Sequence, residues 1–520
     1  MTPEQASKLS LAEQHAWYRG VSSRRALLRG AAGAGAALAG PALLAGQASA
    51  ATVRKSPALI TRPDTPGGHA LPPFGRHIAY GADPTAQIAV AWQVPASVTN
   101  PFIRVGLSPD DLSHRIAAEV RTVTTQASVV SPVDSVAPSA PPVIEQYYLH
   151  ARVDGLWPGE TYYYSVGHHG WDVPGDVRGF TTAPRGRFPF TFTAFGDQGV
   201  SYDAVGTANL VRAQNPAFHL HAGDLAYAED TGHGLITDSY DPRVWDAWFT
   251  EVEAAASQIP WQLSVGNHEM EAWYSPDGYG GQYARFDFPG QPASDTPPTY
   301  YAFTYGNVGV LALDVNDVSY EIPANLGYTG GAQIAWLEQT LKSLRANPEI
   351  DFIVAHFHAC AYCTCVGHGS EGGARQYFTP LFDTYQVDLV INGHNHVYER
   401  TDPLRAGAVT TPAPVGATVH PATDGTTYIT AGGAGNSLYS FTAADSYEGA
   451  VDNVTPVTSF INEPGGIKTP ETVTWSQVRY TGYCLVVMDS IPGGRGATSV
   501  LRVRGLDEAG AEIDRVELVR

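Results

Sequence analysis

Five short polar motifs, each placed directly after an apolar run, constrain the fold of this 520-residue chain more than any other feature. Strand-like and helix-like stretches alternate between them, which predicts a largely parallel sheet with right-handed crossovers. Ligands of such sheets bind at the carboxyl ends of the strands, so we expect the motifs to line one crevice. The motifs are Gly196-Asp197-Gln198-Gly199, Gly223-Asp224-Leu225-Ala226-Tyr227, Gly266-Asn267-His268-Glu269, Ala355-His356 and Gly393-His394-Asn395-His396.

The side chains of these motifs suit two different metal ions. Carboxylate, phenolate and imidazole favour a ferric ion, whereas imidazole, amide and carboxylate favour zinc, manganese or ferrous iron. A shared carboxylate would hold the ions about 3.5–4 Å apart, the spacing of two-metal phosphoryl-transfer sites. The pattern therefore predicts a binuclear metal site. His219 and His221 alternate on one predicted strand and are interpreted as packing residues or as residues that support the ligands, not as ligands themselves.

The α/β part of the chain is expected to cover residues 187–520. Its periodicity predicts helices at 204–214, 244–255, 332–345 and 374–385, and strands at 188–195, 218–221, 261–265, 308–313, 352–355, 387–391, 483–488 and 499–519. Stretches rich in Pro, Gly and Thr at 401–424 and 441–475 are predicted insertions without an assigned role.

Residues 71–183 show strand signals and no helical periodicity, which predicts a separate all-β domain. The turn at Pro158-Gly159 followed by the aromatic run Tyr162-Tyr163-Tyr164 resembles fibronectin type III sandwiches. Residues 51–70, rich in Pro and Gly, are a predicted linker.

The first fifty residues resemble a twin-arginine signal peptide. Arg24-Arg25 precedes a mildly apolar stretch at 31–46, and Ala48-Ser49-Ala50 supplies a small-residue cleavage site. The apolar stretch is shorter than the roughly 20 residues of a spanning helix and contains Pro41. We therefore expect a secreted, extracellular or periplasmic protein with no transmembrane segment.

Export permits disulfides, and we expect one or two among Cys360, Cys363, Cys365 and Cys484, with the pairing left open. A zinc knot is disfavoured because the paired spacing of such sites is absent. The formal net charge of −20 would repel nucleic acid, so no nucleic-acid partner is expected. Oligomeric state is left open.

The five motifs in this order resemble the metallophosphoesterase superfamily, and one departure selects the purple acid phosphatases within it. Most superfamily members carry Asp-x-His in the first motif, where this chain has Gly199. The chain instead has Tyr227 three residues after Asp224, which is the purple acid phosphatase pattern. The resemblance implies a four-layer α/β/β/α catalytic domain preceded by an all-β fibronectin- or immunoglobulin-like sandwich.

The resemblance also implies roles for ten residues. The ferric ligands would be Asp197, Tyr227 and His396, the divalent-ion ligands Asn267, His356 and His394, and Asp224 would bridge both ions. His358 stands where the family usually has Pro. The implied catalytic residues facing the phosphate are His268, His368 and Glu371, the last two at slightly longer spacing from His356 than in the family.

The implied activity is that of a secreted acid phosphatase, in which hydroxide held at an Fe(III) and divalent-metal (Zn, Fe or Mn) centre attacks small-molecule phosphate monoesters. A histidine has a pKa of about 6.5 and donates a proton to the leaving alkoxide only while protonated, which predicts an acid or near-neutral optimum. A phosphodiesterase or nucleotide phosphohydrolase on the same site and a non-catalytic surface-binding protein are the alternatives.

Overall fold

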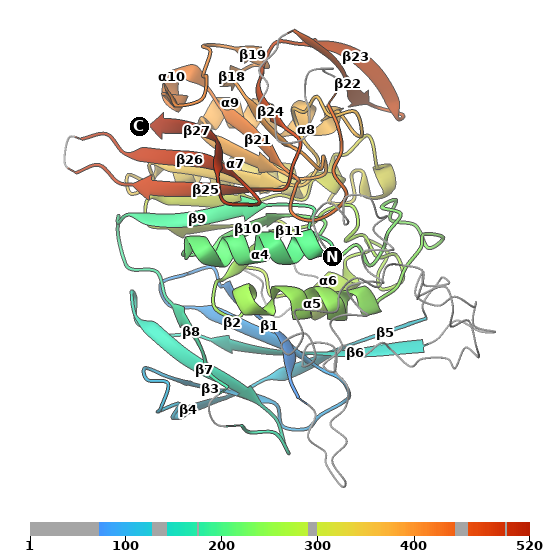
Figure 1. Ribbon diagram of the computed structural model, residues 1–520, viewed down its shortest axis with the longest axis vertical. Coiled ribbons are helices and arrows are strands. Elements are labelled where there is room, and N and C mark those ends of the chain that lie inside the picture. The colour runs from blue at the N-terminus through green and yellow to red at the C-terminus, as the bar shows by residue number, and fades with distance from the viewer. Residues whose placement is uncertain (1–71, 127–142, 174–175, 290–298, 442–455, 495–496) are drawn as a thin grey trace, which may run out of the picture.

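The computed structural model describes residues 72–126, 143–173, 176–289, 299–441, 456–494 and 497–520 (Figure 1). The signal peptide at 1–50 and the linker at 51–70 lie outside these ranges and stay predictions. Within the same ranges, no helix has both the length and the apolar character of a membrane span.

The first domain is a sandwich of two four-stranded antiparallel sheets. Side chains from both inner faces form its core, including the fully buried Trp92, Tyr148 and Tyr164. One sheet contains β1 (Phe74–Tyr80), β2 (Ile88–Val94), β6 (Val143–Val153) and β5 (Glu119–Gln126), and the other β4 (His114–Ala117), β3 (Phe102–Gly106), β7 (Thr161–Gly167) and β8 (Arg178–Thr181).

The second domain contains two packed seven-stranded sheets, which we call sheet I and sheet II. Sheet I has the order β11 (Trp261–Ser264), β10 (His219–Ala222), β9 (Phe190–Phe195), β25 (Cys484–Ile491), β26 (Val500–Asp507), β27 (Glu512–Val519) and β20 (Ala417–Val419). Sheet II has the order β12 (Tyr301–Tyr305), β13 (Val308–Ala312), β14 (Phe352–Phe357), β16 (Leu389–Asn392), β21 (Thr427–Ala431), β17 (Tyr398–Thr401) and β24 (Ser476–Tyr480).

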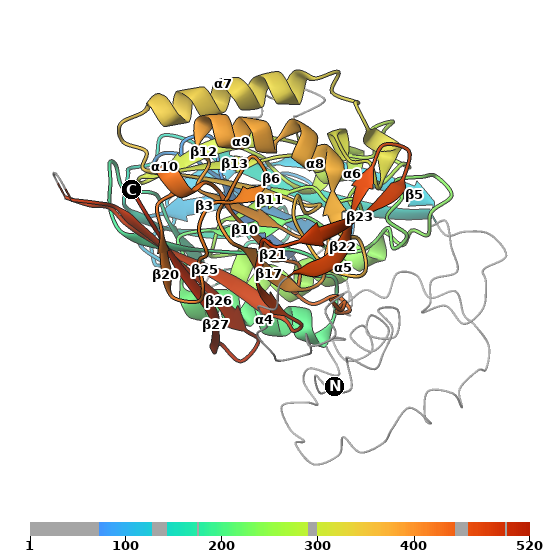
Figure 2. The same cartoon turned by 90° about the horizontal axis from the view of Figure 1, so that it is seen from above.

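Helices cover the outer faces of both sheets, so the domain has the expected α/β/β/α layers. Figure 2 shows α7 (Ala332–Ala346) and α9 (Thr379–Tyr385) on one side and α4 (Tyr202–Gln214) on the other. Strand β14 shows why the layers form, because its alternate side chains pack on different neighbours. Ile353 and Ala355 pack in the cluster with α7, whereas Phe352 and Val354 belong to the core between the sheets.

The sheets are mixed rather than largely parallel, which corrects the sequence prediction. Parallel pairing joins β9, β10 and β11 in sheet I and β13, β14, β16 and β21 in sheet II. The C-terminal strands β25, β26 and β27 extend sheet I beyond β9, and each of them is antiparallel to the strand before it in the sheet. The helix predicted at 374–385 is divided into α8 (Gly372–Tyr377) and α9 at Phe378, because Pro380 begins a new helix.

Charged side chains attach the first domain to helix α5 (Arg243–Ala256) and to the segment after helix α6 (Gly280–Arg285). Arg76 Nε lies 2.6 Å from Glu253, and the buried carboxylate of Asp287 contacts Arg121, Arg152 and His150 at 2.8–2.9 Å. The pairs fix the sandwich against the α5 side of the second domain (Figure 1).

The predicted insertions contain small secondary-structure elements. The hairpin of β22 (Val457–Glu463) and β23 (Ile467–Val473) joins β15 (Ser370–Glu371), and a second hairpin pairs β18 (Leu404–Arg405) with β19 (Ala408–Val409). Short helices complete the fold: η2 (Val315–Asp317), η3 (Pro323–Asn325) and α10 (Pro421–Asp424).

The expected disulfides are absent, because all four cysteines are buried free thiols. Cys360, Cys363 and Cys365 pack in one small apolar cluster with Val397 and Phe441. The thiol of Cys360 donates to the carbonyl oxygen of Gly393 at 2.8 Å. Cys484 lies apart from this cluster, at the start of β25 in sheet I.

Candidate metal centre

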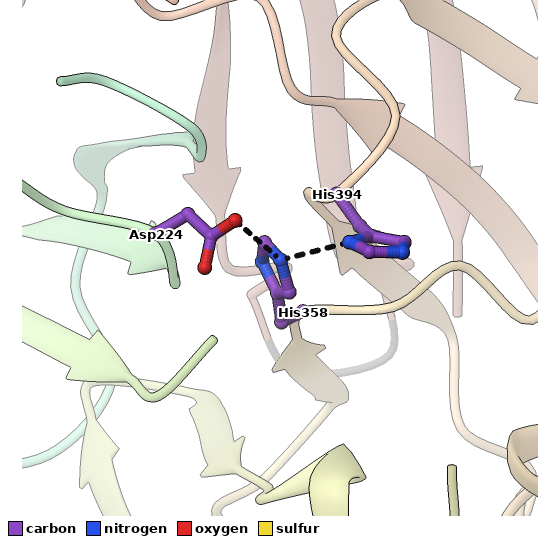
Figure 3. Close-up of side chains that lie close together, drawn as sticks. All are labelled: Asp224, His358 and His394. Atoms are coloured by element: carbon purple, nitrogen blue, oxygen red, sulfur yellow. Dashed lines mark hydrogen bonds and ion pairs between the residues drawn. The ribbon is translucent and has the colours of Figure 1, made fainter. Parts of the chain in front are cut away.

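The loops after five strands meet at one edge of the two sheets, as expected from the motif order. Asp197, Asp224 and Asn267 follow β9, β10 and β11 of sheet I, while His358 and His394 follow β14 and β16 of sheet II. The Asp224, His358 and His394 side chains place potential ligand atoms within 4.8 Å of one another (Figure 3). Residues from both sheets therefore contribute to one site.

The backbone at the site is locally unusual. Asp197, Asp224, Tyr227 and His394 have φ angles of 63°, 54°, 56° and 67°. Such left-handed angles are uncommon outside glycine and persist where surrounding structure imposes them, often at functional sites. Gly266 permits a further close approach, since a Cβ there would lie 2.1 Å from Asp224 Oδ1.

His358 is the centre of one group of potential ligand atoms. Its Nε2 atom lies 2.9 Å from Asn267 Oδ1, 3.0 Å from Asp224 Oδ2 and 3.2 Å from His394 Nδ1. Figure 3 shows Asp224 and His394 on either side of the His358 ring. An amide oxygen, a carboxylate and two imidazoles thus converge on one small space, which is a suitable set for a divalent transition metal.

A second group of potential ligand atoms lies beside the first. The Tyr227 hydroxyl is 3.0 Å from His396 Nε2 and 3.3 Å from Asp197 Oδ1. Asp197 Oδ1 is also 3.9 Å from His358 Nε2, which joins the two groups. Carboxylate, phenol and imidazole form the oxygen-rich set that suits a ferric ion.

In His358, His394 and His396, the ring nitrogen that points away from the two ligand groups, here called the outer nitrogen, makes a hydrogen bond. His358 Nδ1 donates to Ala222 O at 2.8 Å, His396 Nδ1 to Ser437 O at 2.6 Å, and His394 Nε2 to the carboxylate of Glu321 at 3.1 Å. Metal-binding histidines are typically oriented in this way by a carbonyl or carboxylate. The inner nitrogens are consequently directed toward the shared space.

Electrostatics at the site also favour cations. Burial lowers the pKa of His358, but the charges of Asp224 and Asp197 outweigh it and raise this pKa to about 10. Burial raises the pKa of Asp197 to about 8; His358 opposes this rise and the charge of Asp224 adds to it. Despite its burial, Asp224 has a lowered pKa because it faces His358. Without metal, the two carboxylates therefore favour the protonated form of the His358 ring, and a bound cation would replace that proton.

The structure corrects the prediction of His356 as a ligand. Strand β14 continues to Phe357, so His356 is still inside the strand and its side chain is buried between the sheets. Neither ring nitrogen of His356 has a hydrogen-bond partner among the described residues, and burial lowers its pKa to about 3. His358, the first residue after the strand, takes the predicted place.

His268 and His368 both line a crevice of about 420 Å³ that opens over the two ligand groups. His268 Nδ1 donates to Glu229 O, which leaves its Nε2 3.8 Å from Asp224. The rest of the lining includes Asp230, Glu321, Tyr439 and Lys468. The hairpin of β22 and β23 contributes Lys468, which gives the predicted insertion at 441–475 a place beside the site.

Glu371 is not in the crevice, contrary to the sequence prediction. Its buried carboxylate accepts hydrogen bonds from Ser319 Oγ and from the backbone nitrogens of Tyr320, Glu321 and Gly373. The carboxylate that contacts His368 is Glu321, whose Oε1 accepts from Nδ1 at 2.8 Å. Glu371 therefore supports the loop that carries this other acid.

Sequence reasoning missed three residues of the site. Glu269 accepts from the backbone nitrogens of Asp224, Leu225 and Gly266, and its place inside the third motif was the available signal. Tyr439 stacks on His396 with ring centroids 4.1 Å apart, and Glu321 contacts two histidines. No local pattern distinguishes these last two residues.

Comparison with known proteins agrees with this geometry. Residues 73–182 match the family described as "Purple acid Phosphatase, N-terminal domain", and residues 190–398 match "Calcineurin-like phosphoesterase". An uncharacterized protein of Mycobacterium tuberculosis is 31% identical over 519 residues, covering 93% of this chain and 92% of that protein. Purple acid phosphatase 23 of Arabidopsis thaliana is 29% identical over 271 residues, covering 48% of this chain and 57% of that protein.

A solved structure shares the fold. Purple acid phosphatase PPD1 from yellow lupin (Lupinus luteus) seeds aligns with a TM-score of 0.63 at 18% identity, over 86% of this chain and 75% of that chain. The layered fold and the metal-ligand geometry at its strand ends define a metal-dependent phosphoester hydrolase of the calcineurin-like class. Within that class, the chain belongs to the purple acid phosphatase family.

Proposed function

We propose that this protein is an exported acid phosphatase that hydrolyses small phosphate monoesters at an Fe(III) and divalent-metal centre. The observation that carries the proposal is the convergence of two ligand groups, with His358 Nε2 3.0 Å from Asp224 and Tyr227 3.0 Å from His396. Fe(3+)-Zn(2+) purple acid phosphatase 12 of Arabidopsis thaliana, 28% identical over 304 residues, supports this choice of metals.

The ligand assignment follows the two groups. Asp197, Tyr227 and His396 would hold the ferric ion, and Asn267, His358 and His394 the divalent ion, with Asp224 between them. When bound, the two cations supply Lewis-acid activation of water and neutralise the phosphate charge. This assignment keeps every predicted metal ligand except His356.

His268 is proposed to donate the proton that the leaving alkoxide needs. Because its Nδ1–H is held by Glu229 O, only the protonated ring has a second N–H, on Nε2, to donate. Burial lowers the pKa of His268, and the charge of Asp224 partly opposes that effect. The protonated form is thus confined to acidic solution, which supports an acid optimum. His368 would hold a phosphate oxygen from the opposite wall of the crevice.

Two measurements test the metals. The visible spectrum of the mature protein, recorded with its metal content, should show a tyrosinate–iron band and near-equal amounts of iron and a second metal. A colourless protein holding two other metals would contradict the ferric assignment. Loss of turnover in Asn267→Ala would contradict the non-catalytic alternative, in which the purified chain has no turnover to lose.

Substrate choice is tested by comparing kcat/KM for an aryl monoester, a bis-aryl diester and a nucleotide on one preparation. Under the proposed function, the monoester should be hydrolysed fastest. A preference for the diester would instead indicate a phosphodiesterase, and a preference for the nucleotide would indicate a nucleotide phosphohydrolase. Export is tested by fusing residues 1–50 to a reporter and replacing Arg24 and Arg25 by lysine, which should block secretion.

A further inference from the structure

Glu321 connects two histidines that have separate tasks in the proposed site. Its Oε2 accepts from His394 Nε2 at 3.1 Å, and its Oε1 accepts from His368 Nδ1 at 2.8 Å. The rings of these two histidines are 4.0 Å apart between centroids. One carboxylate therefore contacts both a proposed metal ligand and a proposed phosphate-binding residue.

The surrounding structure fixes Glu321 from several directions. Glu371 accepts hydrogen bonds from the backbone N–H groups of Tyr320 and Glu321, and these bonds anchor the loop between η2 and η3. Asn462 of β22 donates to Glu321 Oε2 at 3.2 Å and to His368 O at 2.7 Å. The carboxylate is thus placed by segments far apart in the sequence.

The two contacts use both oxygens of this acid. Oε1 accepts from His368, and Oε2 accepts from His394 and from Asn462. An ionised carboxylate accepts hydrogen bonds at both oxygens, so it serves both rings together. An amide would offer one acceptor and would leave one ring without its partner.

We propose that Glu321 is a positioning residue that orients His394 toward the divalent metal and His368 toward the substrate phosphate. This inference rests on the proposed function. His394 Nδ1 faces His358, so the hydrogen bond of Nε2 to Glu321 keeps Nδ1 directed into the group of proposed ligands. The same carboxylate fixes His368, and loss of Glu321 should therefore impair metal retention and phosphate binding at once.

The test is metal release from the holoenzyme. Wild type, Glu321→Gln and the control Glu463→Gln are incubated with a chelator at one pH, and both metals are measured over time. Partners that orient metal-bound histidines are typically worth about 10–100-fold in metal affinity or activity. We expect Glu321→Gln to lose the divalent metal about 10–100-fold more readily, to keep the other metal, and to show a raised KM.

Glu463 is a matched control because it is an exposed carboxylate at the end of β22, and Thr469 is its hydrogen-bond partner. Glu463→Gln makes the same chemical change outside the crevice and should release metal at the wild-type rate. If Glu321→Gln also retains both metals and the wild-type KM, the inference is wrong. If Glu463→Gln releases metal as fast as Glu321→Gln, the effect is general and the inference is equally wrong.

Two further variants separate the tasks and guard against misfolding. His368→Ala should raise KM while metal release stays at the wild-type rate, because His394 keeps its partner. Glu321→Asp keeps both acceptor oxygens on a shorter side chain and should fall between wild type and Glu321→Gln; wild-type metal retention and KM in this variant would count against the inference. Failure of the proposed function would instead appear in the wild type itself, as missing metal or missing turnover.

Discussion

The same substitution at two histidines two residues apart distinguishes the proposed ligand from its neighbour. We predict that His358→Leu loses the divalent metal and nearly all phosphatase activity, whereas His356→Leu keeps both. Both side chains are fully buried, so the two variants bury the same new side chain at similar depth. Only His358 contacts the other ligand groups, at 2.9–3.2 Å from Asn267, Asp224 and His394.

The expected magnitudes follow from these contacts. A metal ion contributes several kcal/mol of charge stabilisation in the transition state, and each 1.4 kcal/mol is about a tenfold change in rate. Losing about 4 kcal/mol in His358→Leu therefore lowers kcat about 1,000-fold. His356→Leu removes two buried nitrogens that have no partner among the described residues. A buried polar group without a partner costs about 1–3 kcal/mol, so this variant should be no less stable than the wild type.

The assay is aryl phosphate hydrolysis at saturating substrate, with the metal content of each variant measured on the same sample. Thermal unfolding shows whether both variants remain folded, which separates loss of a ligand from loss of the fold. We expect His356→Leu to retain activity within about threefold, a change below 1 kcal/mol. The opposite pattern, with metal lost in His356→Leu and kept in His358→Leu, would refute the assignment.

Three other predictions concern colour, metal uptake and the domain interface. Tyr227→Phe should lose the visible band while its circular dichroism stays that of the wild type; a persisting band would exclude tyrosinate as its source. The raised pKa of His358 keeps this ring protonated in the metal-free protein, so metal binding must displace a proton. The affinity for metal should therefore fall about tenfold per pH unit on acidification for each proton displaced. Metal titrations at several pH values test this, and an affinity that does not change with pH would show that it is wrong. Asp287→Ala should lower the free energy of unfolding by about 3 kcal/mol in denaturant titrations, the low end of the range for buried ion pairs, because Arg152 is 42% exposed. Burial opposes ionisation of Asp287, but His150 and the two arginines outweigh burial and lower its pKa. The difference in unfolding free energy between wild type and Asp287→Ala should therefore shrink below about pH 4, where the carboxylate of the unfolded chain becomes protonated. An equal difference at every pH would argue against an ionic cause.

The meeting of the polar motifs at one site was largely predictable, because it depends on which residues follow the strands. Apolar runs locate the strands, and the side chains after parallel strands meet at one edge whatever the details of packing. The order of strands and following residues is sufficient to predict that Asp197, Asp224, Asn267 and His394 meet. The mixed character of the sheets was not predictable, because pairing of β25 with β9 joins residues nearly 300 positions apart.

The choice between His356 and His358 could not be made from strand periodicity. A strand end is uncertain by a few residues in the sequence, and here a difference of two residues decides which imidazole leaves the sheet. In the structure, Phe357 still pairs with Asn392 of the neighbouring strand, so β14 ends only at Phe357. The pairing partner, far away in the chain, sets the boundary.

The amino-acid sequence by itself determined that an all-β domain precedes an α/β domain and in which order the polar loops follow the strands, because these depend on local patterns. The tertiary structure decided that His358 enters the site, that Glu321 rather than Glu371 faces His368, and that the cysteines remain free thiols. Each of these outcomes depends on contacts between segments far apart in the chain, and such contacts form only when the two sheets, the loop before η3 and the β22–β23 hairpin pack together.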